Sequence, residues 1–349
     1  MIDNQETSQA FALFQNWLKN RSFFIHYQPI ISLKDGSTYG YEALTRFPDN
    51  DIFSHPGELF NFANSTNSLY DLEKVTRELA IQSISKDLYP HEKLWINLTP
   101  EVIYDEAFTT GYTRNLLNEC GLKADQIVFE ITERSAIEDF IAFKDVLQHY
   151  RKQGFLIAID DAGAGYSSLE AITELQPDFI KIDRSLINGI HESFTRQYML
   201  EALLQLSEKM RATVIAEGVE LSEELECIGN LGVHYAQGFF LARPNFPVPI
   251  VNPGCLDVIQ KIIPSNYADH TITENTTFFD LLQMISRFKG RFDTSWVKMD
   301  VPHVHSVIPL TEVIQFITHI QCRGSVPLNQ PIWSNILEYR AQSERFIMK

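Results

Sequence analysis

The sequence predicts an α/β protein, a TIM-like (β/α)8 barrel with one antiparallel strand, followed by a small C-terminal α/β module. Three observations support this fold class. Eight short apolar runs alternate with segments of helical periodicity, seven of those runs contain or precede a polar side chain, and the alternation stops at a proline-rich stretch near Phe246.

The eight apolar runs have the length and composition of strands, and they are Phe23 to Gln28, Tyr39 to Leu44, Leu94 to Leu98, Ile127 to Ile131, Leu156 to Asp160, Phe179 to Ile182, Thr213 to Ala216 and Tyr235 to Phe240. Segments with apolar residues at three- and four-residue spacing separate most of them, as in Asp71 to Leu88, Ile137 to Lys152 and Thr195 to Met210. Because strands that alternate with helices pair in parallel, eight of them predict a closed barrel.

The first two runs are an exception, since only Ile30 to Thr38 separates them. A parallel crossover needs a dozen or more residues, so this short link predicts a hairpin and one antiparallel strand. Before it, residues 8 to 19 have one apolar helical face, formed by Phe14, Trp17 and Leu18, which predicts a helix that covers the bottom of the barrel.

Composition and charge limit the classes of function. The net charge of −16 argues against a broad surface for duplex nucleic acid, because such binding depends on many Lys and Arg contacts to phosphates. The sequence has neither a signal-peptide pattern nor an apolar run of 18 residues, so we expect a cytoplasmic protein without a membrane span. Its four cysteines lack paired metal-ligand spacing and are expected to be reduced thiols.

Polar residues recur where the predicted strands end, namely Glu42, Asn97, Glu130, Asp160 with Asp161, Lys181, Glu217 and Gln237. Any one of them could be a solvated strand end or a helix cap. Together they indicate a site, because barrel enzymes draw their catalytic residues from these ends, and buried ionisable groups without partners cost several kcal/mol each. Carboxylates and an amide oxygen without convergent His or Cys favour Mg2+ or Mn2+ over zinc.

The residues around these positions resemble a known family. Glu42-Ala43-Leu44, followed by Thr45-Arg46, resembles the EAL signature of cyclic di-GMP phosphodiesterases. Further blocks follow in the family's order over roughly residues 20 to 247: WINLTP, FEITERS, IDDAGAGYSSL, PDFIKIDRSLI, AEGVE and AQGFFLARP. The resemblance implies metal-dependent hydrolysis of cyclic di-GMP to linear pGpG by a homodimer.

The resemblance also implies roles for individual residues. One metal ion would be held by Glu42, Asn97, Glu130 and Asp160, and a second by Asp160, Asp161 and Glu217. The catalytic residues would be Lys181, which hydrogen-bonds the attacking water, Glu217 as general base, and Glu220, which supports Lys181. Arg46, Leu44 and Gln237 would contact substrate or orient water, and Glu133 would tether the loop after the fifth strand. That loop departs from the common family pattern DDFGTGYSSL at Ala162 and Ala164, neither of which is a metal ligand.

The sequence is also compatible with two other functions. The first is a catalytically silent receptor for cyclic di-GMP, although such domains usually lack a metal ligand or the base. The second is a phosphodiesterase of another type with His303 and His305 as metal ligands, but no third His or carboxylate motif lies near them. No GGDEF signature precedes the barrel, so synthesis of cyclic di-GMP within this chain is not expected.

We expect three parts in the chain: an N-terminal helix over residues 1–19, the barrel over 20–247 and an accessory or regulatory α/β module over 255–349. The last part has a strand at His270 to Ile272, a helical face from Phe278, strands at Ser295 to Met299 and Val304 to Ile308, and a helical face from Val313. This order faintly resembles one CBS half-module, a type that binds adenine nucleotides in pairs. The alternative is a small domain that only caps or dimerises the barrel.

Overall fold

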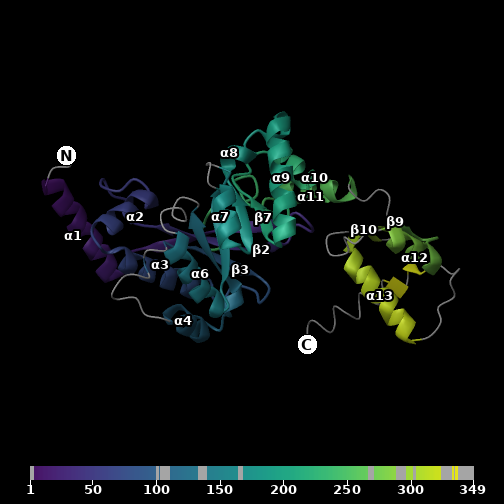
Figure 1. The fold of residues 1–349 in the computed structure, drawn as a ribbon, viewed down its shortest axis with the longest axis horizontal. Helices are drawn as coiled ribbons and strands as arrows, with labels where there is room; N and C mark the ends of the chain where they lie inside the picture. The colour runs from purple at the N-terminus through teal and green to yellow at the C-terminus, as the bar shows by residue number, and fades with distance from the viewer. Residues whose placement is uncertain are drawn as a thin grey trace. The chain divides into compact units, whose positions relative to one another are not determined.

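The structure, a computed structural model, describes residues 4–99, 102, 111–132, 140–163, 168–265, 271–287, 296–301, 304–323, 332–333 and 335–336. The chain divides into two compact units, residues 1–259 and 260–349 (Figure 1).

The first unit is built around a closed barrel of eight strands, which confirms the predicted fold class. Its strands are β1 (Phe24–Ser32), β2 (Thr38–Arg46), β3 (Lys93–Asn97), β4 (Ile127–Thr132), β5 (Leu156–Ala162), β6 (Phe179–Ile182), β7 (Thr213–Ala216) and β8 (Tyr235–Ala236). Strands β2 to β8 pair in parallel, whereas β1 is antiparallel to both β2 and β8. The short link between the first two strands therefore forms the predicted hairpin.

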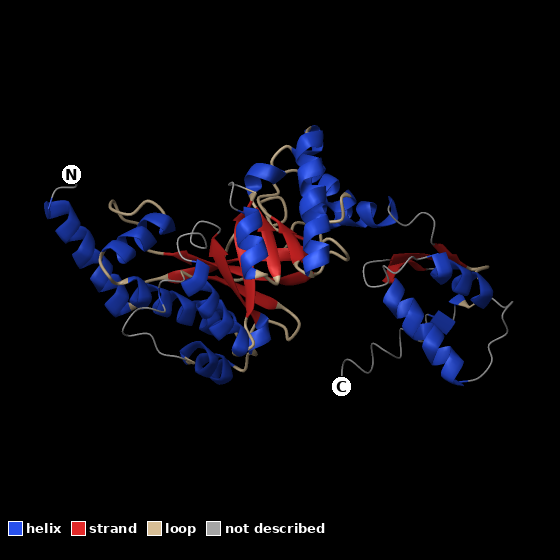
Figure 2. Cartoon of the chain, in the orientation of Figure 1, coloured by secondary structure: helices blue, strands red, loops and turns tan. Residues whose placement is uncertain are grey.

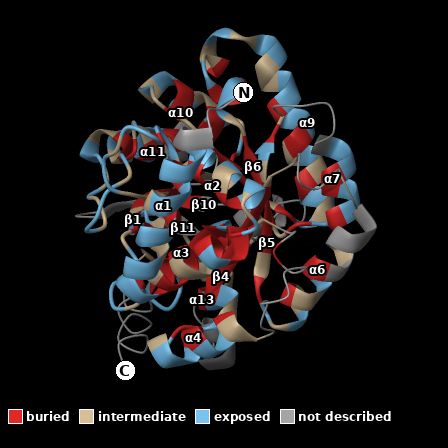
Figure 3. Ribbon diagram, turned by 90° about the vertical axis from the view of Figure 1, so that its left-hand side faces the viewer, coloured by how far each residue is buried: buried red, intermediate tan, exposed pale blue. Residues whose placement is uncertain are grey.

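Helices enclose the barrel strands (Figure 2). They are α1 (Asn4–Asn20), α2 (Pro56–Ser65), α3 (Leu69–Ile84), α4 (Tyr112–Cys120), α6 (Phe140–Lys152), α7 (Ser168–Leu175), α8 (Arg184–Ile187), α9 (Phe194–Met210), α10 (Ser222–Asn230) and α11 (Pro253–Ser265). Buried residues concentrate on the strands and on the helix faces turned toward them, while the outward helix faces are exposed (Figure 3).

Strand β8 is shorter than the sequence predicts, because the chain leaves the barrel after Ala236. The backbone at Gly238 packs so tightly on the turn after β7 that a Cβ atom there would lie 2.1 Å from the carbonyl oxygen of Val219. Backbone hydrogen bonds from Val219 N to Gln237 O at 3.1 Å and from Phe240 N to Val219 O at 3.0 Å hold this contact. Residues 237–240 thus pair with a turn rather than with a strand.

Helix α1 packs at the end of the barrel opposite to the end that the sequence predicts. Trp17 stacks on Phe47 with ring centroids 5.5 Å apart and also contacts Phe23 and Phe53. Phe47 and Phe53 follow the C-terminal end of β2, and Phe23 precedes β1, whose first residue pairs with Arg46 at that same end. The prediction that α1 covers the barrel bottom is wrong, because β1 runs antiparallel and so begins where the parallel strands finish.

The second unit contains β9 (Thr271–Thr273), α12 (Phe278–Arg287), β10 (Trp296–Val301), β11 (Val304–Pro309) and α13 (Leu310–Arg323). Its sheet has the order β11-β10-β9, with β9 parallel and β11 antiparallel to β10. Apolar side chains from both helices, β9 and β10 form its core, including Ile272, Leu281, Val297, Met299 and Phe316. Helices and strands thus follow one another in the order that the sequence predicts.

Candidate active site

The inward-facing positions of the barrel change from apolar to polar toward one end. One apolar side chain from each of six strands forms a buried cluster, comprising Ile30, Trp95, Val128, Ala158, Phe179 and Ile215. Side chains on a strand alternate between its two faces, so the residue two positions further toward the same end also faces inward. Those positions hold Gln28 on the antiparallel strand and Asn97, Glu130, Asp160, Lys181 and Glu217 on or just after the parallel ones.

Lys181 stands at the centre of this polar layer. Its side chain is 1% exposed, and four carboxylates surround its ammonium group. Nζ lies 2.5 Å from Glu217 Oε1, 2.7 Å from Glu130 Oε1, 3.2 Å from Asp160 Oδ1 and 3.4 Å from Glu42 Oε2. The site therefore holds more negative than positive charge, which favours the binding of further cations.

The electrostatics of the cluster follow from burial and crowding. Burial opposes the charged form of Lys181, but the surrounding carboxylates, Asp160 foremost, together raise the pKa of its ammonium well above the usual value. Burial also raises the pKa of the Glu130 carboxyl, against the attraction of Lys181. Burial and the nearby charge of Asp160 likewise raise the pKa of Glu217.

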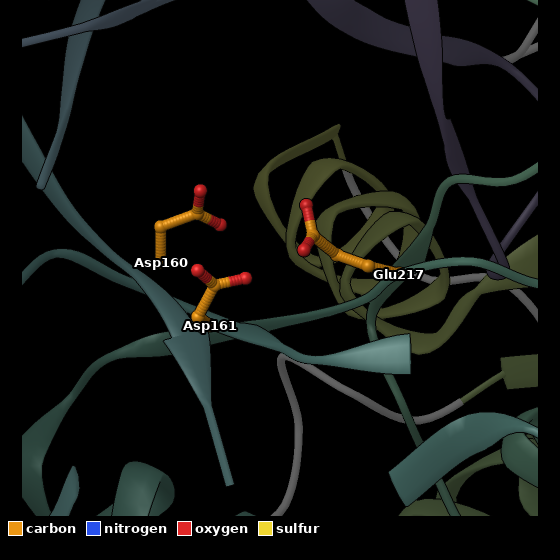
Figure 4. Close-up of side chains that lie close together, drawn as sticks. All are labelled: Asp160, Asp161 and Glu217. Carbon is orange, nitrogen blue, oxygen red and sulfur yellow. The ribbon is translucent and has the colours of Figure 1, made fainter. Parts of the chain in front are cut away.

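The oxygens of this cluster suit metal ions. Asp160, Asp161 and Glu217 each offer a carboxylate oxygen, and these oxygens lie within 4.8 Å of one another, with the three side chains turned toward a common space (Figure 4). Oε1 of Glu130 and Oδ1 of Asp160 are buried against the Lys181 ammonium, whereas Oε2 of Glu130 is buried with no donor among the described residues. Buried carboxylate oxygens in this state fit a hard divalent cation, which prefers oxygen ligands.

A bulge in β5 places both aspartates at the site. The register between β5 and β6 shifts between Ile159 and Ala162, and Asp161 has a positive φ of 59°. A non-glycine residue in this region is strained by about 1–3 kcal/mol, and such strain clusters at functional sites. Without the bulge, successive side chains would point to opposite faces of the strand, and Asp161 would leave the cluster.

Gln28 is a site residue that the sequence analysis missed. It pairs with Glu42 across the hairpin. Gln237 Nε2 donates to Glu42 Oε2 at 2.5 Å and to Gln28 Oε1 at 3.0 Å, and Gln28 Nε2 donates to Ala242 O at 3.0 Å. The rule of looking at C-terminal strand ends does not apply to an antiparallel strand, but the register of the predicted hairpin would have identified Gln28.

The remaining predicted residues lie around two cavities beside the cluster. Asn97, Arg46 and Leu44 line one of about 340 Å3, together with Glu130. Glu73 of α3, also on its wall, accepts a hydrogen bond from Thr99 N at 2.8 Å and so anchors the loop that follows Asn97. A second cavity of about 280 Å3 is lined by Glu42, Asp160, Glu217, Glu220 and Gln237, with Arg184 beside them.

The structure gives Glu220 another partner than the predicted Lys181, and some of the predicted residues lie outside the described part of the chain. Glu220 Oε2 lies 2.9 Å from Arg184 Nη2, whereas the ion pairs of Lys181 among the described residues are with the four carboxylates named above. Glu133, Ala164 and His303 lie outside the described residues, as does the side chain of His305, while Ala162 is fully buried.

Comparisons with known proteins agree with this geometry. The EAL domain family model matches residues 11–244. The chain is 32% identical over 236 residues to the probable cyclic di-GMP phosphodiesterase PdeB of Escherichia coli, a match that covers 66% of this chain and 44% of that protein. The chain thus spans less than half the length of this curated relative.

Solved structures show the same fold. The calcium and cyclic di-GMP complex of Klebsiella pneumoniae BlrP1 matches with a TM-score of 0.59 and 33% identity, over 65% of this chain and 56% of that one. The cyclic di-GMP complex of the PaMucR phosphodiesterase matches with a TM-score of 0.61 and 27% identity, over 68% of this chain and 97% of that one. Within the described part of the chain, no helix combines the length and apolar character needed to cross a bilayer.

Proposed function

Because this chain belongs to the EAL domain family, we propose that it is a metal-dependent phosphodiesterase that hydrolyses cyclic di-GMP to linear pGpG. The observation that carries the proposal is the buried cluster of four carboxylates around Lys181, next to the Asp160, Asp161 and Glu217 oxygens. Similar proteins named as cyclic di-GMP phosphodiesterases, and similar structures in complex with that dinucleotide, support the choice of substrate.

We assign two divalent ions, Mg2+ or Mn2+, to the all-oxygen ligands of the site. One would be held by Glu42, Asn97, Glu130 and Asp160, and the other by Asp160, Asp161 and Glu217. When bound, such ions supply Lewis-acid stabilisation of the negative charge that develops at the phosphodiester. A similar structure contains manganese together with cyclic di-GMP.

The chain's own residues supply the proton transfers and the positioning. Lys181 donates a hydrogen bond to the attacking water and offsets negative charge, and Glu217 accepts the proton that this water loses. The water oxygen bonds to phosphorus, the bond from phosphorus to the 3′ oxygen breaks, and that oxygen takes up a proton to become the free hydroxyl of pGpG. Gln237, held by Gln28, orients the water.

Other residues hold the substrate and the loops around it. Arg46 has a planar guanidinium suited to a phosphate oxygen, and Leu44 lines the same cavity. We keep Glu133 as the tether of the loop after β5. We keep Glu220 as a support of Lys181 from the wall of the second cavity, where its ion pair is with Arg184.

The proposal is tested by incubating the purified protein with cyclic di-GMP and Mn2+ or Mg2+ and separating the products by chromatography. We expect pGpG with either ion and inhibition by Ca2+, because calcium accepts looser geometry and so binds without aligning the water. Binding of cyclic di-GMP in a calorimeter without any pGpG at micromolar protein would contradict hydrolysis and favour the receptor function.

Two substitutions test the assigned residues. Glu42→Ala and Glu217→Ala should each lower turnover by at least about a hundredfold, the scale typical of a positioned acid-base or electrostatic group. The melting temperature of the metal-free protein should stay level or rise, because like charges then repel less. Glu226→Ala, an exposed carboxylate on α10, serves as control. A metal-free Glu217→Ala protein that fails to fold would show that the carboxylate has a structural role.

We further propose that the protein forms homodimers through α9. Three large side chains on its first two turns are exposed to solvent, Phe194 by 74%, Tyr198 by 64% and Met199 by 51%. Phe194 and Tyr198 are four residues apart and so lie on one helix face, Met199 flanks them, and exposed apolar patches of this kind mark interaction sites. Tyr198→Glu should shift the mass measured by light scattering from dimer to monomer, whereas an unchanged mass would contradict this interface.

A further inference from the structure

Arg184 has no role in the proposed reaction, although it lines the same cavity as three of the central carboxylates. It is the first residue of α8, two residues after the end of β6 and three residues beyond Lys181. Its side chain is 51% exposed, and it shares the wall of the cavity of about 280 Å3 with Glu42, Asp160 and Glu217. It is the single basic residue among the described side chains on that wall.

Two contacts fix the position of Arg184. Its Nη2 atom donates a hydrogen bond to Glu220 Oε2 at 2.9 Å. Its aliphatic stem lies against Gly218, where a Cβ atom would come within 2.5 Å of Arg184 Cγ and 2.6 Å of Arg184 Cβ. Gly218 also has a positive φ of 66°, which glycine adopts without strain. The arginine stem therefore lies across the backbone directly after Glu217.

The two basic side chains at the site, Lys181 and Arg184, have different ion-pair partners. Lys181 is buried among the four central carboxylates, whereas Arg184 pairs with Glu220, which is not one of them. A guanidinium carries several N–H donors, and the bond to Glu220 uses one of its nitrogens, so the group can hold Glu220 and an anion at once. Half of its surface faces solvent, where a ligand entering the cavity would meet it.

A cyclic dinucleotide contains two phosphodiesters, and only one of them can lie at the reacting carboxylates at a time. The second must lie outside the cluster and the ions assigned to it, where Arg184 is the cation among the described lining residues of this cavity. We infer that Arg184 is a substrate-binding residue that contacts an oxygen of the phosphate that is not being cleaved. This inference rests on the proposed function and adds a specificity for dinucleotides over small single phosphodiesters.

The test compares two substrates and three variants, Arg184→Gln, Arg184→Lys and a control. Arg184→Gln removes the charge and keeps the Cβ and Cγ atoms that lie against Gly218, and Arg21→Gln is its matched control. Arg21 is also a partly exposed arginine, 42% by side chain, paired with a glutamate, Glu78, but it lines neither cavity. Initial rates are measured with cyclic di-GMP and with bis(p-nitrophenyl) phosphate, which has one phosphodiester, and circular dichroism checks that all three variants fold.

With cyclic di-GMP, Arg184→Gln should raise KM by about tenfold and change kcat less than about twofold, because one charge-assisted hydrogen bond at a half-exposed position is lost. With bis(p-nitrophenyl) phosphate, kcat/KM should change less than about twofold. Arg184→Lys should recover part of the loss, and Arg21→Gln should behave as the wild type. Equal losses with both substrates, or an unchanged KM for cyclic di-GMP, would overturn the inference.

Failure of the proposed function would be recognised separately, because the wild-type protein would then produce no pGpG. In that case the affinity for cyclic di-GMP is measured by calorimetry with Ca2+ in place of Mn2+. A Kd raised about tenfold in Arg184→Gln, and not in Arg21→Gln, would support the contact with the dinucleotide even in a receptor. Equal Kd values in all three proteins would overturn it.

Discussion

Lys181 shows how one residue can make an otherwise unstable cluster compatible with folding. Four carboxylates meet in a barrel interior where unpaired charges are costly, and the buried ammonium group lies within 3.4 Å of each of them. The same arrangement leaves a surplus of negative charge, which divalent ions would neutralise. Lys181 therefore has a structural task in the metal-free protein besides the one proposed in hydrolysis.

Replacing Lys181 by methionine separates these two tasks. Lys181→Met should lower the free energy of unfolding of the metal-free protein by about 3 kcal/mol, because removing one partner of a buried ion pair leaves uncompensated charge. Mn2+ should then raise the melting temperature of the variant more than that of the wild type, since the ions replace the lost positive charge. Calorimetric melting with and without Mn2+ measures both effects, and equal metal-induced shifts in the two proteins would contradict this account.

Most of the candidate site could be predicted at the level of residues, because it follows from period-2 alternation along strands that the sequence locates well. Asn97, Glu130 and Lys181 each stand two positions beyond a buried apolar residue. Gln28 and Arg184 escaped prediction for different reasons. Gln28 depends on the register of the hairpin, and Arg184 begins α8, where its side chain contacts Gly218 and Glu220, which are distant in the sequence.

At the level of elements, the sequence locates the eight strands but not where each one stops. Strand β5 extends to Ala162 through a bulge, and β8 ends at Ala236 because the next residues pair with the turn after β7. Both deviations occur at the candidate site, where tertiary contacts override local pattern. Helix α1 illustrates the same limit, because its apolar face shows that the helix packs on the barrel but does not show which residues it contacts.

The contacts of α1 lead to a stability prediction. Trp17 is 4% exposed and contacts Phe23, Phe47 and Phe53, so Trp17→Ala should lower the free energy of unfolding by about 3 kcal/mol, as is typical of large core truncations. Phe11→Ala on the same helix, 43% exposed, should cost less than about 1 kcal/mol. Urea denaturation followed by far-UV circular dichroism measures both. Similar losses in the two variants would mean that α1 is held by other residues.

At the level of the whole molecule, the end of the barrel domain proposed from the sequence differs from the boundary between the two compact units. We propose the barrel domain over residues 20–247, preceded by the helix of residues 1–19, and an accessory or regulatory module over residues 255–349. The division of the chain into compact units falls instead between Ile259 and Gln260, inside α11. The first half of α11 thus belongs with the barrel in the structure.

Contacts of α11 explain this difference and predict the effect of truncation. Asn252 N donates to Leu241 O at 2.7 Å, its Nδ2 donates to Phe240 O at 2.9 Å, and Cys255 and Ile259 are buried. Residues 1–249 should therefore remain soluble and hydrolyse cyclic di-GMP, but melt at least about 5 °C below residues 1–265, because the apolar side chains of α11 no longer cover the barrel.

Relative to the full chain, residues 1–265 should show a changed specific activity or dimer affinity if the module regulates the barrel. Melting temperature, pGpG formation and light scattering of the three proteins measure this. Equal melting of the two truncated chains would show that α11 does not stabilise the barrel. Turnover and dimer mass that match the full chain would exclude a regulatory module, because removing a domain that biases the site or the interface must change one of these quantities.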